Sequence, residues 1–541
     1  MPTKPFIDYT YDDSVALFQA AAPVGDGTRT FPLDKPRRSA VAQTATLFYL
    51  SDHWQSSKGF IGQLPPPTLL GAESMKADIK AGFVSENVIR EVTKTHVGGI
   101  LGREPVWSFL PADPTVEADL SNESSFENTT GESLTPWWNE RKALVDLQKA
   151  ARTLVLEGRV VRRLFIPRGL LNSQGRATAT DLRSALKFIY FETHTADVAG
   201  VFTDPFTQRQ IGVFLFEEKD IYGEVTANCA ELSFLDDNGD TICKVVKDKG
   251  DPATYGPYKL GGHLLVYELE REALITEQVQ SQQRALNLAH TMMMRNINMA
   301  GSRERTITNA QPPISLKKTT TENTPDTTIT KTFPGTFKTG AGAVNFVMGV
   351  PIHDENGQIV GYTNPNVTIV DPAPVDTFVK TADHYRSSMY SQCHQRHVLI
   401  VDKADTSGRA REVARREFER SLKETKIVME AGGRWMLEAT LRLSAQISNQ
   451  SSKYADLRAD FNCLLDAGEP DPEKQKTVIE LRKSGLISAE TGRNWIGVED
   501  AAAELAKIKA ETKEDPSQPE PVKDPNAPPN GGGTVVSTSV S

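Results

Sequence analysis

The sequence predicts an α+β protein in which strands and helices occupy separate stretches of the chain. Three observations lead to this prediction. Strand-like runs joined by turn residues fill much of the first half, a long helix-forming segment follows over Gly262–Met299, and a Thr- and Pro-rich stretch separates it from a second helical segment near Val375. Two helices interrupted by a β-rich insertion are more typical of an assembly component than of a catalyst.

Length and composition limit the classes of protein. The 541 residues are too many for one ordinary domain, and 38% hydrophobic with 24% charged residues is typical of a folded protein. A net charge of −9 disfavours a surface that grips phosphates broadly, although an acidic channel wall can surround DNA without trapping it. The chain has no signal peptide and no apolar run that could span a bilayer, so we expect a cytosolic protein without a membrane partner.

The first 135 residues are predicted to alternate between helices and loops. We expect an irregular arm to about Gln43, a helix over Thr44–Trp54 and another over Ser85–Thr95 with Ser85 as its N-cap. The acidic, Ser-rich stretch Asp113–Thr135 predicts a surface loop.

A helix, a glycine and a strand follow in direct succession. Trp137–Glu157 carries an apolar face, Gly158 suits a helix C-terminus, and Arg159–Pro167 is strand-like. Asp236–Asp240 and Asp354–Gly357 each contain Asn-Gly between strand-like runs, which favours hairpin turns over calcium loops. Further strands are expected over Ile189–Thr193, Ile211–Phe216, Ala230–Phe234 and Thr241–Val246.

The long helix is predicted over residues 263–300, with a thin apolar stripe. Such a stripe fits packing against other copies of the chain or a two-helix hairpin within one chain, and both remain open. A β-rich insertion over 301–375 precedes the return helix. Lys317 and Lys318 in the insertion make a weak basic spot that either contacts a partner or DNA or is a solvated surface pair.

The return helix ends in a possible metal cluster. Cys393, His394 and His397 lie close in sequence, but no fourth ligand is evident, so we predict no metal and no other cofactor. The four cysteines form no CxxC pair, which argues against a zinc ribbon or a disulfide framework.

The last third is predicted to be mainly helical. We expect a short strand over Val398–Val401, a polar loop over Asp402–Gly408, and a helix over Arg409–Glu430. Gly432-Gly433 is expected to break this helix before another begins at Trp435. Short helices over Pro472–Glu511 and a disordered tail from Thr512 complete the chain.

Two short motifs give this order of elements a known counterpart. Ser407-Gly-Arg-Ala410 opens a charged helix, and Gly485-Leu-Ile-Ser-Ala-Glu-Thr491 precedes Asp500-Ala-Ala-Ala-Glu-Leu505. With the interrupted helix pair, they resemble the portal proteins of tailed bacteriophages. The resemblance implies a ring-forming fold with these parts: an N-terminal arm (1–43), an α/β wing (44–262), two stem helices (263–300 and 376–397), a β-rich clip (301–375), a strand and tunnel loop (398–408), a channel-side helix returning to the wing (409–467), a helical crown (468–511) and a disordered tail (512–541).

The resemblance also implies a function and partners. A portal is a dodecameric ring at one capsid vertex, through which viral double-stranded DNA is packaged and ejected without sequence specificity. Its partners are the terminase large subunit, the major capsid and scaffolding proteins, and a head-completion or adaptor protein, and it is found in the virion and, during assembly, in the host cytoplasm. Lys317 and Lys318 would lie at the clip docking surface, and the residues of the tunnel loop facing DNA would be Asp402, Lys403, Asp405, Thr406 and Ser407.

Two other classes were weighed against a portal. An enzyme is not expected, because the chain has no phosphate-binding Gly-x-x-x-x-Gly-Lys-Ser/Thr loop, no HExxH and no Gly-x-Ser-x-Gly. Another phage tail or baseplate component, without a role in DNA packaging, would share the order of helix, β-insertion and helix. It would differ in ring symmetry or form a rod.

Overall fold

The computed structural model describes residues 5–18, 38–53, 82–113, 115–116, 125–170, 177–204, 207–301, 305–309, 314–319, 329–334, 349–369, 373–400, 408–465, 478 and 480–481. The chain divides into two units, one made of Met1–Asp405 with Val413–Ala467 and the other of Thr406–Glu412 with Gly468–Ser541. Of the second unit, only residues 408–412, 478, 480 and 481 are described, and these are helical.

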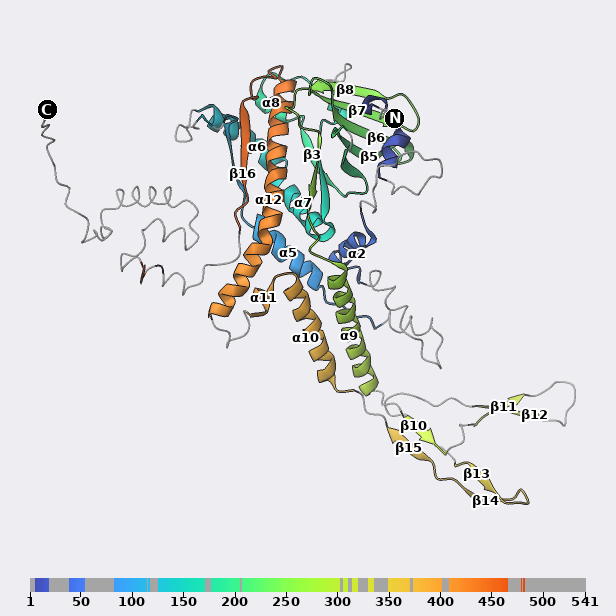
Figure 1. Cartoon of the computed structure of the whole chain (residues 1–541). Helices are drawn as coiled ribbons and strands as arrows, with labels where there is room; N and C mark the ends of the chain where they lie inside the picture. The colour runs from blue at the N-terminus through green and yellow to red at the C-terminus, as the bar shows by residue number, and fades with distance from the viewer. Residues whose placement is uncertain are drawn as a thin grey trace, which may run out of the picture. The chain divides into compact units, whose positions relative to one another are not determined.

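The described chain mixes helices and strands, so the α+β prediction is confirmed at that level (Figure 1). Two antiparallel sheets form most of the first half, one in the order β3-β2-β9 and one in the order β4-β5-β6-β7-β8. Their strands are β2 (Arg159–Phe165), β3 (Tyr190–His194), β4 (Ala199–Thr203), β5 (Gln210–Lys219), β6 (Val225–Leu235), β7 (Thr241–Lys247), β8 (Ala253–Tyr258) and β9 (Val266–Glu270). The five strands expected in this region are all present.

Helices pack with the smaller sheet into one hydrophobic core. Gly158 ends α7 with a left-handed φ of +80°, as predicted, and a Cβ there would lie 2.8 Å from the Arg271 carbonyl oxygen. The helices of this half are α1 (Tyr11–Ala16), α2 (Ala40–Tyr49), α5 (Val88–Leu101), α6 (Phe126–Glu140), α7 (Ala143–Glu157) and α8 (Leu182–Leu186), with single 3-10 turns at Phe6–Asp8 and Arg168–Leu170.

Three predictions in this half are wrong. Asn87, not Ser85, caps α5, because its side chain accepts a 2.9 Å hydrogen bond from the Arg90 amide. The predicted loop over Asp113–Thr135 becomes helix α6 from Phe126; its polar composition hid the helix, whose hydroxyl groups donate back to carbonyls one turn earlier. The single helix expected from Trp137 is two helices, because Lys142 has a left-handed φ of +54° between them.

One turn geometry occurs three times, after Asp220, Asp236 and Asp354. In each, the aspartate Oδ1 accepts from the backbone amides two and four residues later, and a glycine with positive φ occupies the fourth position. The hairpin predictions for Asp236 and Asp354 are thus confirmed. The third turn, between β5 and β6, differs at its tip, where Ile221 and Tyr222 are 92% and 84% exposed.

The two long helices of the second half form an antiparallel hairpin (Figure 1). They are α9 (Glu277–Gly301) and α10 (Val375–Gln392), and their direction follows from two hydrogen bonds, Gln282 to Ser388 and Asn296 to the Ala373 carbonyl. The predicted start at residue 263 is wrong, since the alternating sequence of β9 pairs with β2 instead.

The described residues between these helices are mainly strands and turns, as predicted for a β-rich insertion. Its strands pair antiparallel in three ribbons: β10 (Arg305–Thr308) with β15 (Asn366–Ile369), β11 (Ile314–Thr319) with β12 (Ile329–Pro334), and β13 (Pro351–His353) with β14 (Ile359–Tyr362).

Two further predictions fail after α10. The expected strand at Val398 lies in a short helix, α11 (Arg396–Ile400), and the expected break at Gly432-Gly433 lies inside α12 (Gly408–Ile447), which runs unbroken for 40 residues. These glycines serve close packing: a Cβ on Gly432 would lie 2.8 Å from Leu269, and one on Gly433 would lie 2.6 Å from the Phe461 ring. Phe461 belongs to β16 (Leu457–Asn462), which pairs with β1 (Val106–Pro111). Among the described helices, none has the length and apolar character needed to cross a bilayer.

Candidate functional site

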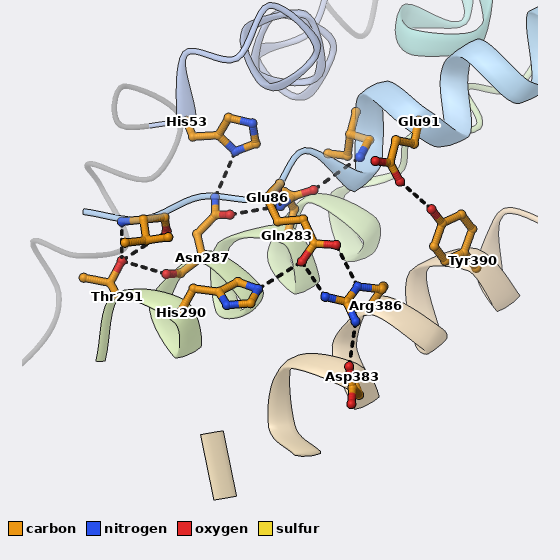
Figure 2. A network of polar contacts seen from close by, with 12 residues as sticks. His53, Glu86, Glu91, Gln283, Asn287, His290, Thr291, Asp383, Arg386 and Tyr390 are labelled. Atoms are coloured by element: carbon orange, nitrogen blue, oxygen red, sulfur yellow. Dashed lines mark hydrogen bonds and ion pairs between the residues drawn. The ribbon is translucent and has the colours of Figure 1, made fainter. Parts of the chain in front are cut away.

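A polar network fastens the base of the α9–α10 hairpin to the segment before α5 (Figure 2). We call it the hairpin junction. Its members come from four separate parts of the chain, and they are His53, Glu86, Glu91, Gln283, Asn287, His290, Thr291, Asp383, Arg386 and Tyr390.

Glu86 is the centre of the junction. Both of its oxygens accept 2.7 Å hydrogen bonds from Arg386, and His290 Nε2 lies 3.0 Å from Oε2. Burial raises the pKa of Glu86, but the bonds from Arg386 and His290 outweigh burial, so this pKa lies below its ordinary value of 4.5. The hydrogen bonds with Glu86 in turn raise the pKa of Arg386. The bidentate geometry fixes both the distance and the angle between α10 and the segment before α5.

A stripe of buried polar side chains runs along α9. Gln283 donates to the Glu86 carbonyl at 2.6 Å, Asn287 lies 3.0 Å from the His53 ring, and Thr291 accepts from the Val84 amide at 3.2 Å. These three residues of α9 are completely buried. Because buried polar groups are costly unless paired, this stripe permits only one register between α9 and the segment beside it.

Tyr390 adds a contact between α10 and α5. Its hydroxyl donates to Glu91 at 2.6 Å. Burial is the main cause that raises the pKa of Tyr390, and the hydrogen bond with the Glu91 carboxylate raises it further. Gln395, just after the end of α10, continues the contact by donating to the Val92 carbonyl at 2.8 Å. On α9, Gln283 accepts a 3.3 Å hydrogen bond from the Ile89 amide, so the hairpin has polar attachments to α5 from both of its helices.

A second buried cluster joins α5 to α12. His96 Nε2 lies 3.0 Å from the Thr425 hydroxyl, and Arg271 donates to both groups. Burial, and then the nearby Arg271 charge, lowers the pKa of His96 to about 3. The ring therefore stays neutral, and its Nε2 can accept a hydrogen bond from Arg271. This cluster holds α12 against the same helix that anchors the hairpin.

Chemically, the arrangement suits positioning rather than reaction. The described residues contain no group of three His, Cys, Asp or Glu side chains that could hold a metal ion. Each ionisable side chain of the junction has a polar partner within it, as Figure 2 shows. The junction fixes how the α9–α10 hairpin is attached to the rest of the first unit.

The predicted site residues have different outcomes. Asp402, Lys403, Asp405, Thr406 and Ser407 lie outside the described residues, between α11 and α12. Lys317 and Lys318 lie on β11, opposite Lys331 and Thr330 of β12 in the backbone register. The prediction that these residues contact DNA or a docking partner remains a prediction.

The structure separates the three residues of the possible metal cluster. Cys393 is buried at the end of α10, where burial raises the pKa of its thiol to about 12, so the thiolate that a metal needs is disfavoured. His394 Nδ1 lies 3.1 Å from Glu417, and the His397 ring packs 4.4 Å from Phe418.

Sequence reasoning missed the hairpin junction. The apolar stripe of α9 was noticed, but Gln280, Gln283, Asn287 and Thr291 also recur at helical spacing and are almost fully buried. A polar stripe at that spacing was the available signal. No protein-family model matches this chain, and no curated protein matches it significantly.

Proposed function

We propose that this chain is a portal-type ring subunit. Twelve copies would form a ring at one capsid vertex, through which double-stranded DNA is packaged and later ejected. The terminase large subunit and head-completion proteins would dock on the β-rich insertion. The observation that supports this most is the order of elements after the sheets: α9, the β-rich insertion, α10, the short α11, and then the 40-residue α12.

The helix hairpin suits the role of a stem. At about 1.5 Å per residue, the 25 residues of α9 span about 37 Å. The hairpin junction holds the base of the two helices at fixed positions, so that a load applied at the insertion is transmitted to the body. A passive conduit needs this stiffness and needs no catalytic group.

Exposed apolar side chains support the proposal that the chain assembles with other proteins or with copies of itself. On the β13–β14 ribbon, five large apolar residues are exposed: Val350, Ile352, Ile359, Val360 and Tyr362. A two-stranded ribbon is marginally stable alone, and exposed apolar patches usually mark protein contacts. The tip formed by Ile221 and Tyr222 is a second such surface.

Electron microscopy of the purified chain and of an insertion-deleted variant tests the proposal. Asn296 reaches the Ala373 carbonyl at 2.7 Å, so a short Gly-Ser linker can replace residues 302–372 between the two helices. We expect both proteins to form rings with a central pore, and only the complete chain to bind its terminase. A six-fold disc or a rod would instead favour a tail or baseplate component, and terminase binding by the deletion variant would refute docking on the insertion.

A further inference from the structure

An open groove lies between β1 and α6, on a part of the first unit that the proposed function does not use. Its cavity measures about 590 Å³, within the size range of ligand sites. The lining residues that matter below are Glu104, Trp107, Glu127, Gly131, Glu132 and Trp138. We call it the acidic groove.

The charged side chains described along the groove are all acidic. Glu104, Glu127 and Glu132 line it, and none of the other described residues that line it is a lysine or arginine. Glu104 accepts a 3.2 Å hydrogen bond from the buried Trp138 indole, which fixes the position of this carboxylate. Among the described residues, none of the three glutamates is in an ion pair, so their charge is available to a cation.

The walls of the groove fit an extended chain. The half-buried Trp107 ring lies 5.6 Å from Trp138 and offers a face to a cation. In the described part of the chain, β1 pairs with β16 and with no other strand, so no described strand occupies its second edge, and an edge of this kind can accept one. Gly131, which also lines the groove, leaves open space, because a Cβ built there meets nothing within 4 Å.

We propose that the acidic groove binds an extended polypeptide segment carrying lysine or arginine, supplied by a partner protein. The segment would add to the second edge of β1 and place its cations over Trp107 and beside Glu127 and Glu132. Charge favours a basic partner over a second copy of this chain, whose net charge is −9. The proposal depends on the groove alone, so its failure would leave the ring proposal untouched.

Fluorescence anisotropy with the full-length chain tests this binding. The probe is a labelled ten-residue peptide with lysine at alternate positions and valine or threonine between them; the comparison peptide has glutamate in place of lysine. We expect the lysine peptide alone to bind. Gly131→Leu should fill the groove and weaken binding at least about tenfold, whereas Gly131→Ala, which extends only into open space, should bind as the parent does.

Charge is tested on the same helix. Glu132→Gln should weaken binding by up to about fivefold, the scale of one exposed ion pair. Glu140→Gln is the matched control, because Glu140 is also exposed on α6 but does not line the groove. Far-ultraviolet circular dichroism of each variant confirms that α6 is folded.

Three results would overturn the proposal. They are no binding of the lysine peptide at millimolar concentration and low salt, equal binding of the glutamate peptide, and undiminished binding by Gly131→Leu. A photo-crosslinking residue placed at Thr135, another lining position, identifies the occupant directly. Crosslinks to the added lysine peptide support the proposal, while crosslinks to this chain's own segments or to a second copy would refute it.

Discussion

Arg386 on α10 holds Glu86, 300 positions earlier in the chain, through two hydrogen bonds of 2.7 Å each. This pair closes the hairpin junction, because His290 of α9 contacts the same carboxylate. One carboxylate thereby links both helices of the hairpin to the segment before α5. Rigid attachment of the hairpin is the part of the account that mutagenesis can test most simply.

Replacing Arg386 with methionine should lower the free energy of unfolding by about 1–3 kcal/mol, because Glu86 loses two charge-assisted hydrogen bonds while it stays partly buried. Urea denaturation at pH 7 measures the change. Lys380→Met is the control on the same helix, since Lys380 forms only a long, exposed pair with Asp376. Equal stability of the two variants would show that the junction does not hold the hairpin.

The Glu86 contribution should depend on pH. The folded-state pKa of Glu86 is depressed, so its stabilisation is present above the ordinary value of 4.5 and is lost as pH falls through the folded pKa. The stability difference between the parent and Arg386→Met should therefore shrink below about pH 4.5. A difference that stays constant down to pH 3 would mean that Glu86 is not the partner whose charge matters.

His96 should make the chain sensitive to milder acid. Its folded-state pKa of about 3 lies far below the ordinary 6.5, so the unfolded chain gains a proton as pH falls through 6.5, while the folded chain does not. Stability should drop by about 2 kcal/mol between pH 6.5 and 5 from this group alone. His96→Gln should remove that loss, and His384→Gln, at an exposed position, should retain it.

The glycines inside α12 should be intolerant of side chains. Gly433→Ala would place a methyl group 2.6 Å from the Phe461 ring, and we expect a destabilisation of about 1–3 kcal/mol. Gly98→Ala in α5 has open space around the new Cβ and should instead stabilise by about 0.5–1 kcal/mol. Thermal melts of both variants decide the matter, and stabilisation by Gly433→Ala would contradict the close packing of α12 on β16.

The exposed tip between β5 and β6 should serve assembly rather than folding. The double change Ile221→Asp and Tyr222→Asn gives this turn the tip residues that the Asp236 turn already has, so the hairpin should fold normally. We expect an unchanged melting temperature for the dissociated chain and a weakened tendency to form rings. If the variant forms intact rings at the protein concentration at which the parent does, the tip is not part of the interface between subunits.

Local patterns predicted much of the fold. Gly158, the strand after it and the Asn-Gly hairpins were predicted correctly, because each depends on residues adjacent in sequence. One error arose where distant packing decides the outcome: Gly432 and Gly433 resemble a helix break, but they allow Leu269 and Phe461 to pack closely against α12.

The candidate site was predicted less well than the fold. The hairpin junction joins residues more than 190 positions apart, so no local pattern indicates which polar groups are paired. Only the spacing of the buried polar stripe on α9 was visible in advance. The loop residues that the resemblance to portals singled out, Asp402 to Ser407, lie outside the described residues and are still predictions.

The native mass of the purified chain tests the proposed ring most directly. Twelve copies of the 59.5 kDa chain have a mass of about 714 kDa, and a closed heterologous ring should give one sharp mass at or within one subunit of this value. We predict that mass by native mass spectrometry, with a central pore in images of the same sample. A six-subunit mass, or a ladder of masses from an open filament, would contradict the proposal.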